Sequence, residues 1–387
     1  MTNANNMQTM QREQARQTDM KQLQTYGIHH VSSIVGHAQK NIDFNAGILG
    51  LRLVKKTLNF DDRHGYHFYF GNKDGSTGLT TTFPLTDAQE GKMGGGQVKS
   101  IQYAVRPGNL EFWEDRLARF GIVAVQTSGL AGRKLRFKDP TGLNIEILES
   151  EKTTDNVWTF DDITEDQAIL GIEAVTLLSR HPDQTLDLFT NILGYTLENE
   201  DSSLYQLKIH DQLGGHVYLS KEAPKQGNIA IGSVHHVALK ARDEDMELWI
   251  ERLKEAGYHP TEVKQRKYFK AVYFREKGGI LIELSSFGPG VLLDETIDNL
   301  GQSFLIPRHF AEFEEEIKDE LPPIEVRTIT KLGSYTYRNP YEYNIVQERE
   351  ALKKEMEPYR EMEAAGTISE ADAATLRELR RRFVTMK

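Results

Sequence analysis

Two histidine pairs and one glutamate are the residues of this chain best suited to chemistry. His29-His30 and His235-His236 lie in apolar, strand-like runs, and Glu283 lies in another such run, residues 279–284. Imidazole and carboxylate groups in apolar strands are unusual unless they are paired or bind a metal. One histidine from each pair would join Glu283 in a 2-His-1-carboxylate set, which holds iron(II) and leaves neighbouring coordination positions open. The sequence therefore predicts a metal centre of this kind.

Alternation along a strand limits each pair to one metal ligand. Neighbouring strand residues face opposite ways, so only one histidine of each pair can point into the site. The other would be satisfied elsewhere or would serve as an acid–base group beside its neighbour. The residues alone leave open which histidine of each pair is the ligand. His67, in the apolar run 66–70, is interpreted as a core residue rather than a site residue.

Four copies of one β-α-β-β-β unit would position these residues, which predicts an α+β fold. Ile48 and Ile192 occupy matching Ile-Leu-Gly segments 144 residues apart, and Trp113 and Trp249 match at a spacing of 136 residues. The predicted units are as follows: strands 27–35, 52–60, 66–70 and 79–83 with helix 41–48; strand 97–105, helix 110–120 and a last strand ending at 146; a third unit from 171; and a fourth from 233 to 286. A fixed internal period of this kind is the signature of a repeat architecture.

Alignment of the first strands predicts which units meet at the site. The alignment places His30, Gln102, Ala174 and His236 at one equivalent position, and it places Glu146 with Glu283. Only units one and four can then supply two imidazoles, so we expect unit one to pair with unit four and unit two with unit three. Units two and three would keep Glu146 alone, in a plain packing interface.

The chain divides into five segments by composition. The predicted segments are a disordered tail at 1–24, an N-terminal domain of modules one and two at 25–150, an acidic linker at 151–168, a C-terminal domain of modules three and four at 169–325, and a helical C-terminal extension at 326–387. The extension reads as two charge-rich helices, 345–362 and 369–383, the second opened by Ser369 and Asp372 as a capping box. A surface helical hairpin is the simplest interpretation, and a partner-binding arm is the alternative.

Composition excludes several classes of function. The 387 residues carry a formal net charge of −10 without a dense basic block, so nucleic acid is not an expected partner. The absence of cysteine excludes disulfides, thiolate metal sites and cysteine nucleophiles. No long apolar run or apolar signal core is present, so we expect a cytoplasmic protein without a membrane partner. Composition does not exclude a homo-oligomer.

Several separated motifs resemble one known family. The segments Gly27-Ile28-His29-His30, Leu53-Val54-Lys55-Lys56-Thr57, Tyr66-His67-Phe68-Tyr69-Phe70-Gly71, Thr81-Thr82-Phe83-Pro84 and Ser233-Val234-His235-His236 are similar to the hydroquinone-cleaving ring dioxygenases of the vicinal oxygen chelate superfamily. The resemblance covers about residues 26–323. It implies that His30, His236 and Glu283 are the metal ligands, and that Ser32, His29, His235, Arg266 and Tyr273 line the substrate pocket.

The resemblance also implies an activity. It is that of an iron(II)-dependent ring-cleaving dioxygenase of aromatic catabolism, with manganese(II) as the alternative metal, which inserts both atoms of dioxygen into a hydroquinone-type substrate. His29 or His235 would move the substrate proton, Tyr273 would hydrogen-bond a developing oxyanion and Arg266 would add positive charge. On the residues alone, Arg266 lies in a basic run typical of a solvated turn, and Tyr273 could simply fill a strand face.

Three other functions fit the same scaffold. A glyoxalase-like isomerase or lyase usually surrounds its metal with four protein ligands, whereas the run 79–83 offers threonines and no carboxylate. A thiol transferase usually consists of a single pair of units. A metal-free small-molecule binding protein would hold no stoichiometric iron.

Overall fold

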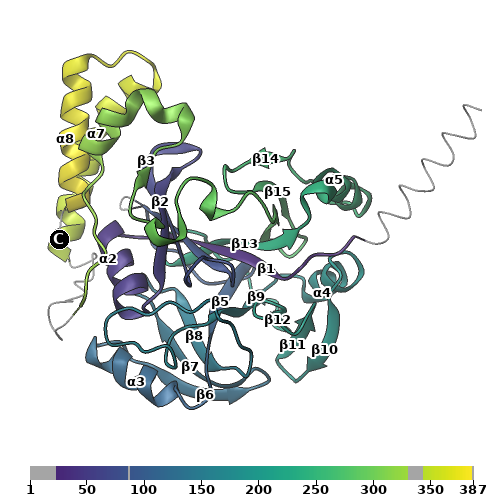
Figure 1. The fold of residues 1–387 in the computed structure, drawn as a ribbon. Helices are drawn as coiled ribbons and strands as arrows, with labels where there is room; N and C mark the ends of the chain where they lie inside the picture. The colour runs from purple at the N-terminus through teal and green to yellow at the C-terminus, as the bar shows by residue number, and fades with distance from the viewer. Residues whose placement is uncertain (1–22, 86–87, 330–342, 386–387) are drawn as a thin grey trace, which may run out of the picture.

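Two mixed β-sheets carry the fold in the computed structural model, which describes residues 23–85, 88–329 and 343–385. Figure 1 shows the sheets at the centre of the molecule, with α3, α4 and α5 on the outside and α7 and α8 stacked at one side beyond β3. The predicted disordered tail, residues 1–24, lies outside the described residues except for its last two positions. One hydrophobic core runs through both sheets.

The larger sheet combines modules one and four. Its nine strands run in the order β14-β15-β16-β13-β1-β4-β3-β2-β17. Module one contributes β1 (Ile28–Val35), β2 (Arg52–Asn59), β3 (Asp62–Gly71) and β4 (Leu79–Pro84), and module four contributes β13 (Ser233–Ala241), β14 (Lys264–Gln265), β15 (Lys270–Arg275) and β16 (Leu281–Ser286). The short β17 (Phe304–Leu305) extends the sheet beside β2. The predicted pairing of unit one with unit four is confirmed.

The smaller sheet combines modules two and three in the order β10-β11-β12-β9-β5-β8-β7-β6. Its strands are β5 (Gln97–Val105), β6 (Val125–Gly129), β7 (Gly132–Lys138), β8 (Asn144–Glu149), β9 (Gly171–Leu178), β10 (Thr196–Glu200), β11 (Leu204–Lys208) and β12 (His216–Ser220). The first strands of the paired modules, β5 and β9, run antiparallel at its centre, as β1 and β13 do in the larger sheet. Each sheet thus takes one module from each half of the chain. The predicted division of the chain at residues 150 and 169 stays a prediction.

One helix from each module packs on the sheets. These helices are α3 (Leu110–Arg119), α4 (Pro182–Asn191), α5 (Met246–Glu255) and, in module one, the short α2 (Ala38–Ile42), which continues as a π-helix over Asp43–Ile48. Trp113 on α3 and Trp249 on α5 are fully buried, which explains why they repeat in the sequence. The helix predicted at 41–48 is present, but it begins earlier and its second half is wider than an α-helix.

The C-terminal extension forms a helical hairpin, as predicted. A 3₁₀ turn (Arg308–Phe313) and α6 (Glu314–Glu320) lead toward it, and α7 (Tyr343–Ala364) and α8 (Glu370–Thr385) enclose a small core of their own. The backbone N–H of Asp372 donates to the Ser369 hydroxyl oxygen at 3.2 Å, so Ser369 caps α8. The Glu320 carboxylate contacts Arg380 of α8 at 3.1 Å and His64 of β3 at 2.9 Å. These ion pairs link the hairpin to the larger sheet. None of the described helices has the length and apolar character needed to cross a membrane.

Candidate active site

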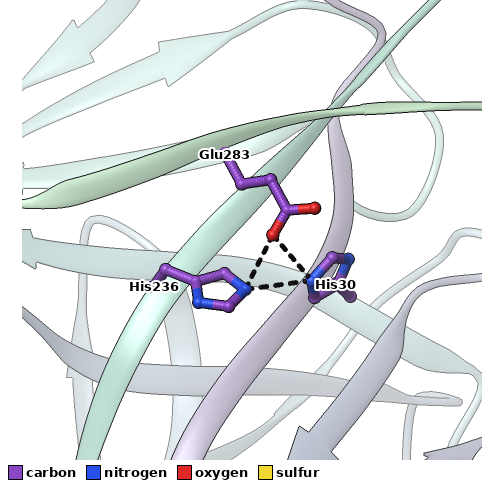
Figure 2. A group of neighbouring side chains, drawn as sticks. All are labelled: His30, His236 and Glu283. Carbon is purple, nitrogen blue, oxygen red and sulfur yellow. Dashed lines mark hydrogen bonds and ion pairs between the residues drawn. The ribbon is translucent and has the colours of Figure 1, made fainter. Parts of the chain in front are cut away.

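Three neighbouring strands of the larger sheet bring His30, His236 and Glu283 together. His30 lies on β1, His236 on the adjacent β13, and Glu283 on β16 beyond it, where Glu283 is in register with Ala238. Figure 2 shows the three side chains converging on one point from these strands. Of all histidine, aspartate and glutamate side chains in the described residues, these three form the one group whose ligand atoms all lie within 4.8 Å of one another.

The distances between the donor atoms suit one octahedral metal ion. His30 Nε2 lies 3.1 Å from His236 Nε2 and 3.3 Å from Glu283 Oε2, and His236 Nε2 lies 2.8 Å from the same oxygen. Ligands at about 2.1 Å from a metal are about 3.0 Å apart when they are at right angles and about 3.4 Å apart in a tetrahedron. The observed spacing is closer to the right-angled arrangement, in which three donors occupy one face and leave the opposite face open.

The charges of the three residues also favour binding of a cation. All three are buried, and Glu283 is fully so. Burial alone would raise the pKa of Glu283, but His30 and His236 hold it well below the usual range, so the carboxylate is charged. Burial lowers the pKa of His236 and thus favours its neutral, metal-binding form. Glu283 Oε1 accepts a hydrogen bond from the Ser285 hydroxyl at 2.6 Å, while Oε2 lies against the two imidazole nitrogens, at 2.8 Å and 3.3 Å. The residues therefore fit a divalent metal ion.

A β-bulge accompanies each histidine pair. The register between β1 and β13 shifts at His29 and again at His235. A bulge inserts one extra residue and re-aims the side chains around it. In both pairs the two rings meet through their Nδ1 atoms at 2.8 Å, so each neighbour hydrogen-bonds the ring of the predicted ligand. Strict alternation is interrupted at each bulge, and the two rings of each pair meet in a T-shaped contact.

A cavity of about 330 Å³ opens beside the three donor atoms. Its lining includes His30, Ser32, His235, His236, Arg266 and Tyr273. The structure thus brings together all the predicted pocket residues except His29, which lines a separate cavity of about 270 Å³. Ser32 shares a 2.6 Å hydrogen bond with Thr81, and the Tyr273 ring meets that of His236 edge-on. Burial raises the pKa of Tyr273 and keeps its hydroxyl protonated as a hydrogen-bond donor.

The larger sheet curls so that its distant strands meet across this cavity. Arg266 follows β14, at one end of the strand order, and Asp61 lies in the turn between β2 and β3, near the other end. The two side chains nevertheless form a bidentate ion pair, at 3.1 and 3.0 Å. Asp61 and Phe60 join the cavity lining, and Phe269 packs against the His30 ring at a centroid distance of 5.2 Å.

Sequence reasoning missed Asp61, Phe269 and the position of His67 in this cavity. Asp61 and Phe269 lie in turns, where no periodic pattern indicates which way a side chain points. His67 also lines the cavity, although the sequence interpretation placed it in the core. Tyr69, two residues further along the same face of β3, lines the same cavity, but this too is visible only in the structure.

The smaller sheet corrects one predicted equivalence. In the smaller sheet Gln102 is in register with Glu146, and in the larger sheet the residue in register with Glu283 is Ala238. Across the central strand pair, Ser100 lies opposite Thr176, in the same way that His236 lies opposite Ser32. Ser100, not Gln102, therefore occupies the place of His236. A shift of two residues keeps every side chain on the same face, so alternation could not reveal the error. The equivalence of Glu146 and Glu283 is confirmed.

The predicted plain packing interface around Glu146 was also wrong. Lys134 and Arg136 contact the Glu146 carboxylate at 2.7 and 3.3 Å, and the Gln102 amide donates to it at 2.8 Å. Arg136 and Glu146 also line a cavity of about 610 Å³. In the smaller sheet, protein cations thus balance the carboxylate charge that a metal ion would balance in the larger one.

Comparison with known proteins identifies the family and supports the fold. The model of the Glyoxalase/Bleomycin resistance protein/Dioxygenase superfamily matches residues 27–147 and 171–284. The "Putative ring-cleaving dioxygenase MhqO" of Bacillus subtilis is 40% identical over 307 residues, which cover 79% of this chain and 98% of that protein. The "Chlorohydroquinone/hydroquinone 1,2-dioxygenase" of Sphingobium indicum is 31% identical over 310 residues, covering 76% and 94%.

A solved structure agrees with this assignment. The crystal structure of a "putative dioxygenase" from Bacillus subtilis superimposes with a TM-score of 0.77 at 40% identity, and the match covers 79% of this chain and all of that one. The resemblance noted in the sequence is thereby confirmed. The chain belongs to the glyoxalase, bleomycin resistance protein and dioxygenase superfamily, the vicinal oxygen chelate proteins.

Proposed function

We propose that this chain is a metal-dependent dioxygenase that cleaves the ring of hydroquinone-type aromatic substrates. His30, His236 and Glu283 would hold iron(II), with manganese(II) as the alternative metal. The observation that carries the proposal is a buried set of three donors, one of them anionic, beside a cavity lined by aromatic rings. The activity named for the relatives from Bacillus subtilis and Sphingobium indicum supports it.

The cavity has the size and lining for an aromatic ring. An apolar cavity of about 150 Å³ can hold benzene, so about 330 Å³ leaves room for ring substituents. Phe269, Phe83 and Tyr69 supply flat surfaces against which a ring can pack. A metal bound by the three donors would supply Lewis acidity and the positions at which phenol oxygen and dioxygen meet.

The protein groups around the donors would handle protons and charge. His235 lines the cavity, and its burial lowers its pKa to about 4, so it is neutral and can accept the proton of a substrate hydroxyl. Tyr273 would donate a hydrogen bond to a ring oxygen that gains negative charge, and Arg266 would add positive charge from the rim. His29 contacts His30 from a different cavity, so its role would be to orient that ring rather than to contact the substrate.

The glyoxalase-like alternative receives less support from the site. Such an enzyme would need a further carboxylate beside the donors, but β4 presents Thr81, whose hydroxyl is bonded to Ser32. In the described residues, the three-member group is complete without a second carboxylate. The relatives at 31% and 40% identity are both named as dioxygenases.

One experiment separates these functions. The protein is loaded anaerobically with iron(II) and then supplied with dioxygen and, in turn, hydroquinones, catechols and the hemithioacetal of methylglyoxal and glutathione. We expect one dioxygen consumed per hydroquinone and both oxygen atoms, traced with ¹⁸O₂, in the open-chain product. Turnover of the hemithioacetal without oxygen uptake would instead establish an isomerase. Failure to retain stoichiometric metal would point to a metal-free binding protein.

A further inference from the structure

His67 is a buried histidine whose two ring nitrogens lack partners. It lies on β3, is only 7% exposed, and faces the cavity beside the metal-binding residues. Neither Nδ1 nor Nε2 makes a hydrogen bond to any described residue. Buried polar groups are nearly always hydrogen-bonded, and leaving one unpaired costs stability. A folded protein keeps such a group at a cost unless a ligand satisfies it.

Aromatic packing holds the ring of His67 in place. It stacks on Phe83 at a centroid distance of 4.1 Å and an interplanar angle of 25°, and it lies 4.3 Å from the Tyr69 ring. Burial lowers the pKa of His67 well below its usual value, which keeps the ring neutral. A neutral imidazole offers one N–H donor and one acceptor nitrogen. His67 thus places an oriented ring, whose donor and acceptor are both unused, in the wall of the cavity.

Three other polar side chains around the cavity already have partners. Arg266 is paired with Asp61, Ser32 with Thr81, and His235 with His236. His67 differs from them because its hydrogen-bonding capacity is wholly unused within the described residues. A hydroxyl group on a ligand can either donate or accept, so it could pair with one of the two nitrogens whichever tautomer is present.

We infer that His67 binds the second hydroxyl group of a 1,4-dihydroxybenzene substrate. The metal-binding set comes from β1, β13 and β16, whereas His67 comes from β3, separated from β1 by β4. One hydroxyl of the ring would bind at the metal, and the other, at the opposite end of the ring, would bind His67. This assignment rests on the proposed function and deepens it, since it explains how a dihydroxylated ring is chosen over a monohydric phenol.

The test measures binding in the metal-loaded protein without oxygen, so that no turnover occurs. Titration calorimetry gives dissociation constants for hydroquinone and for phenol, which lacks the second hydroxyl. For His67→Phe we expect hydroquinone binding to weaken about tenfold, the effect of losing one hydrogen bond, with phenol binding changed less than about twofold. His67→Asn retains a donor and an acceptor and should fall between the two. His259→Gln, which alters an exposed histidine outside the cavity lining, is the matched control and should change neither constant.

Thermal unfolding of the same variants supplies a second readout. Phenylalanine keeps the stacking on Phe83 and removes an unpaired polar group, so His67→Phe should be as stable as the parent protein or more stable. A core histidine with no ligand role would give the same weakening, or none, for hydroquinone and phenol alike. That result would overturn the assignment.

The same titrations distinguish failure of the inference from failure of the proposed function. If the parent protein cleaves hydroquinone but His67→Phe keeps the parent ratio of the two dissociation constants, the role of His67 is refuted and the dioxygenase proposal stands. If the parent protein neither binds hydroquinone nor consumes oxygen with it, the proposed function fails and the role of His67 fails with it.

Discussion

Replacing Glu283 by glutamine tests the metal centre most directly, because the change removes one charge and almost no volume. Glu283 is the one anionic member of the three-donor group, and its Oε2 lies 2.8 Å and 3.3 Å from the two imidazole nitrogens. The amide oxygen can still accept the hydrogen bond of Ser285, so the strand should keep its structure. The substitution therefore separates loss of the ligand charge from loss of the fold.

The expected loss of affinity follows from the position of the residue. Side chains that only support a metal ligand typically cost 10- to 100-fold in affinity when they are changed, so loss of an anionic ligand should cost at least about 100-fold, or about 2.7 kcal/mol. At a free metal concentration that fills about 90% of the parent sites, the variant would be about 8% filled. Metal would then stabilise the parent by about 1.4 kcal/mol and the variant by less than about 0.1 kcal/mol.

Two measurements check this prediction, and the chain contains its own control. Bound iron is quantified after anaerobic equilibration, and the midpoint of thermal unfolding is recorded with and without metal. Glu146→Gln changes the equivalent buried carboxylate of the smaller sheet, which is held by Lys134 and Arg136, and should leave iron binding unchanged. If Glu283→Gln retains most of its iron, or if both variants lose it equally, the assignment of the three donors is refuted.

Three further predictions concern the surroundings of the site and the fold. Asp61→Asn should weaken the bidentate pair with Arg266 and so raise KM for hydroquinone. The free energy of unfolding should change by less than about 1 kcal/mol, because the Asp61 side chain is exposed to solvent. Equal KM values in Asp61→Asn and in the remote control Asp211→Asn would contradict this prediction. Burial alone would raise the pKa of Glu320, but His64 and Arg380 hold it below its ordinary value. The contribution of Glu320 to hairpin attachment is therefore present above about pH 4.3 and is lost as the pH falls below that value. Limited proteolysis across this range should show that the C-terminal hairpin is released at low pH. If a Glu320→Gln variant shows the same pH profile, Glu320 is not the cause. Trp249→Ala, which empties a fully buried position, should lower the free energy of unfolding by about 3–5 kcal/mol in denaturant titrations, whereas a loss below about 1 kcal/mol would mean that α5 does not share the main core.

Much of the fold was predictable because the chain repeats its own pattern. The Trp and Ile-Leu-Gly segments indicated four units, and the uneven distribution of histidine and glutamate among them predicted that unit one meets unit four. Strand boundaries followed the apolar runs closely, with β5 present over the whole of the predicted range 97–105. The alignment of Gln102 with His236 failed, since a two-residue slip leaves the pattern of buried and exposed side chains unchanged.

The sequence by itself determined the repeat, the pairing of its units, and the two histidine pairs and the glutamate from which the site is built, because hydrophobic periodicity and the rarity of buried charge are local properties of the chain. Only the tertiary structure decided which side chains share a cavity. His29 and His235 both lie at bulges yet line different cavities, and the curl of the sheet brought Asp61 to Arg266 across the site. Above all, the unpaired nitrogens of His67 became visible only with its neighbours in place. A sequence shows that a polar residue is buried, but whether it has a partner depends on groups brought near it by distant parts of the chain.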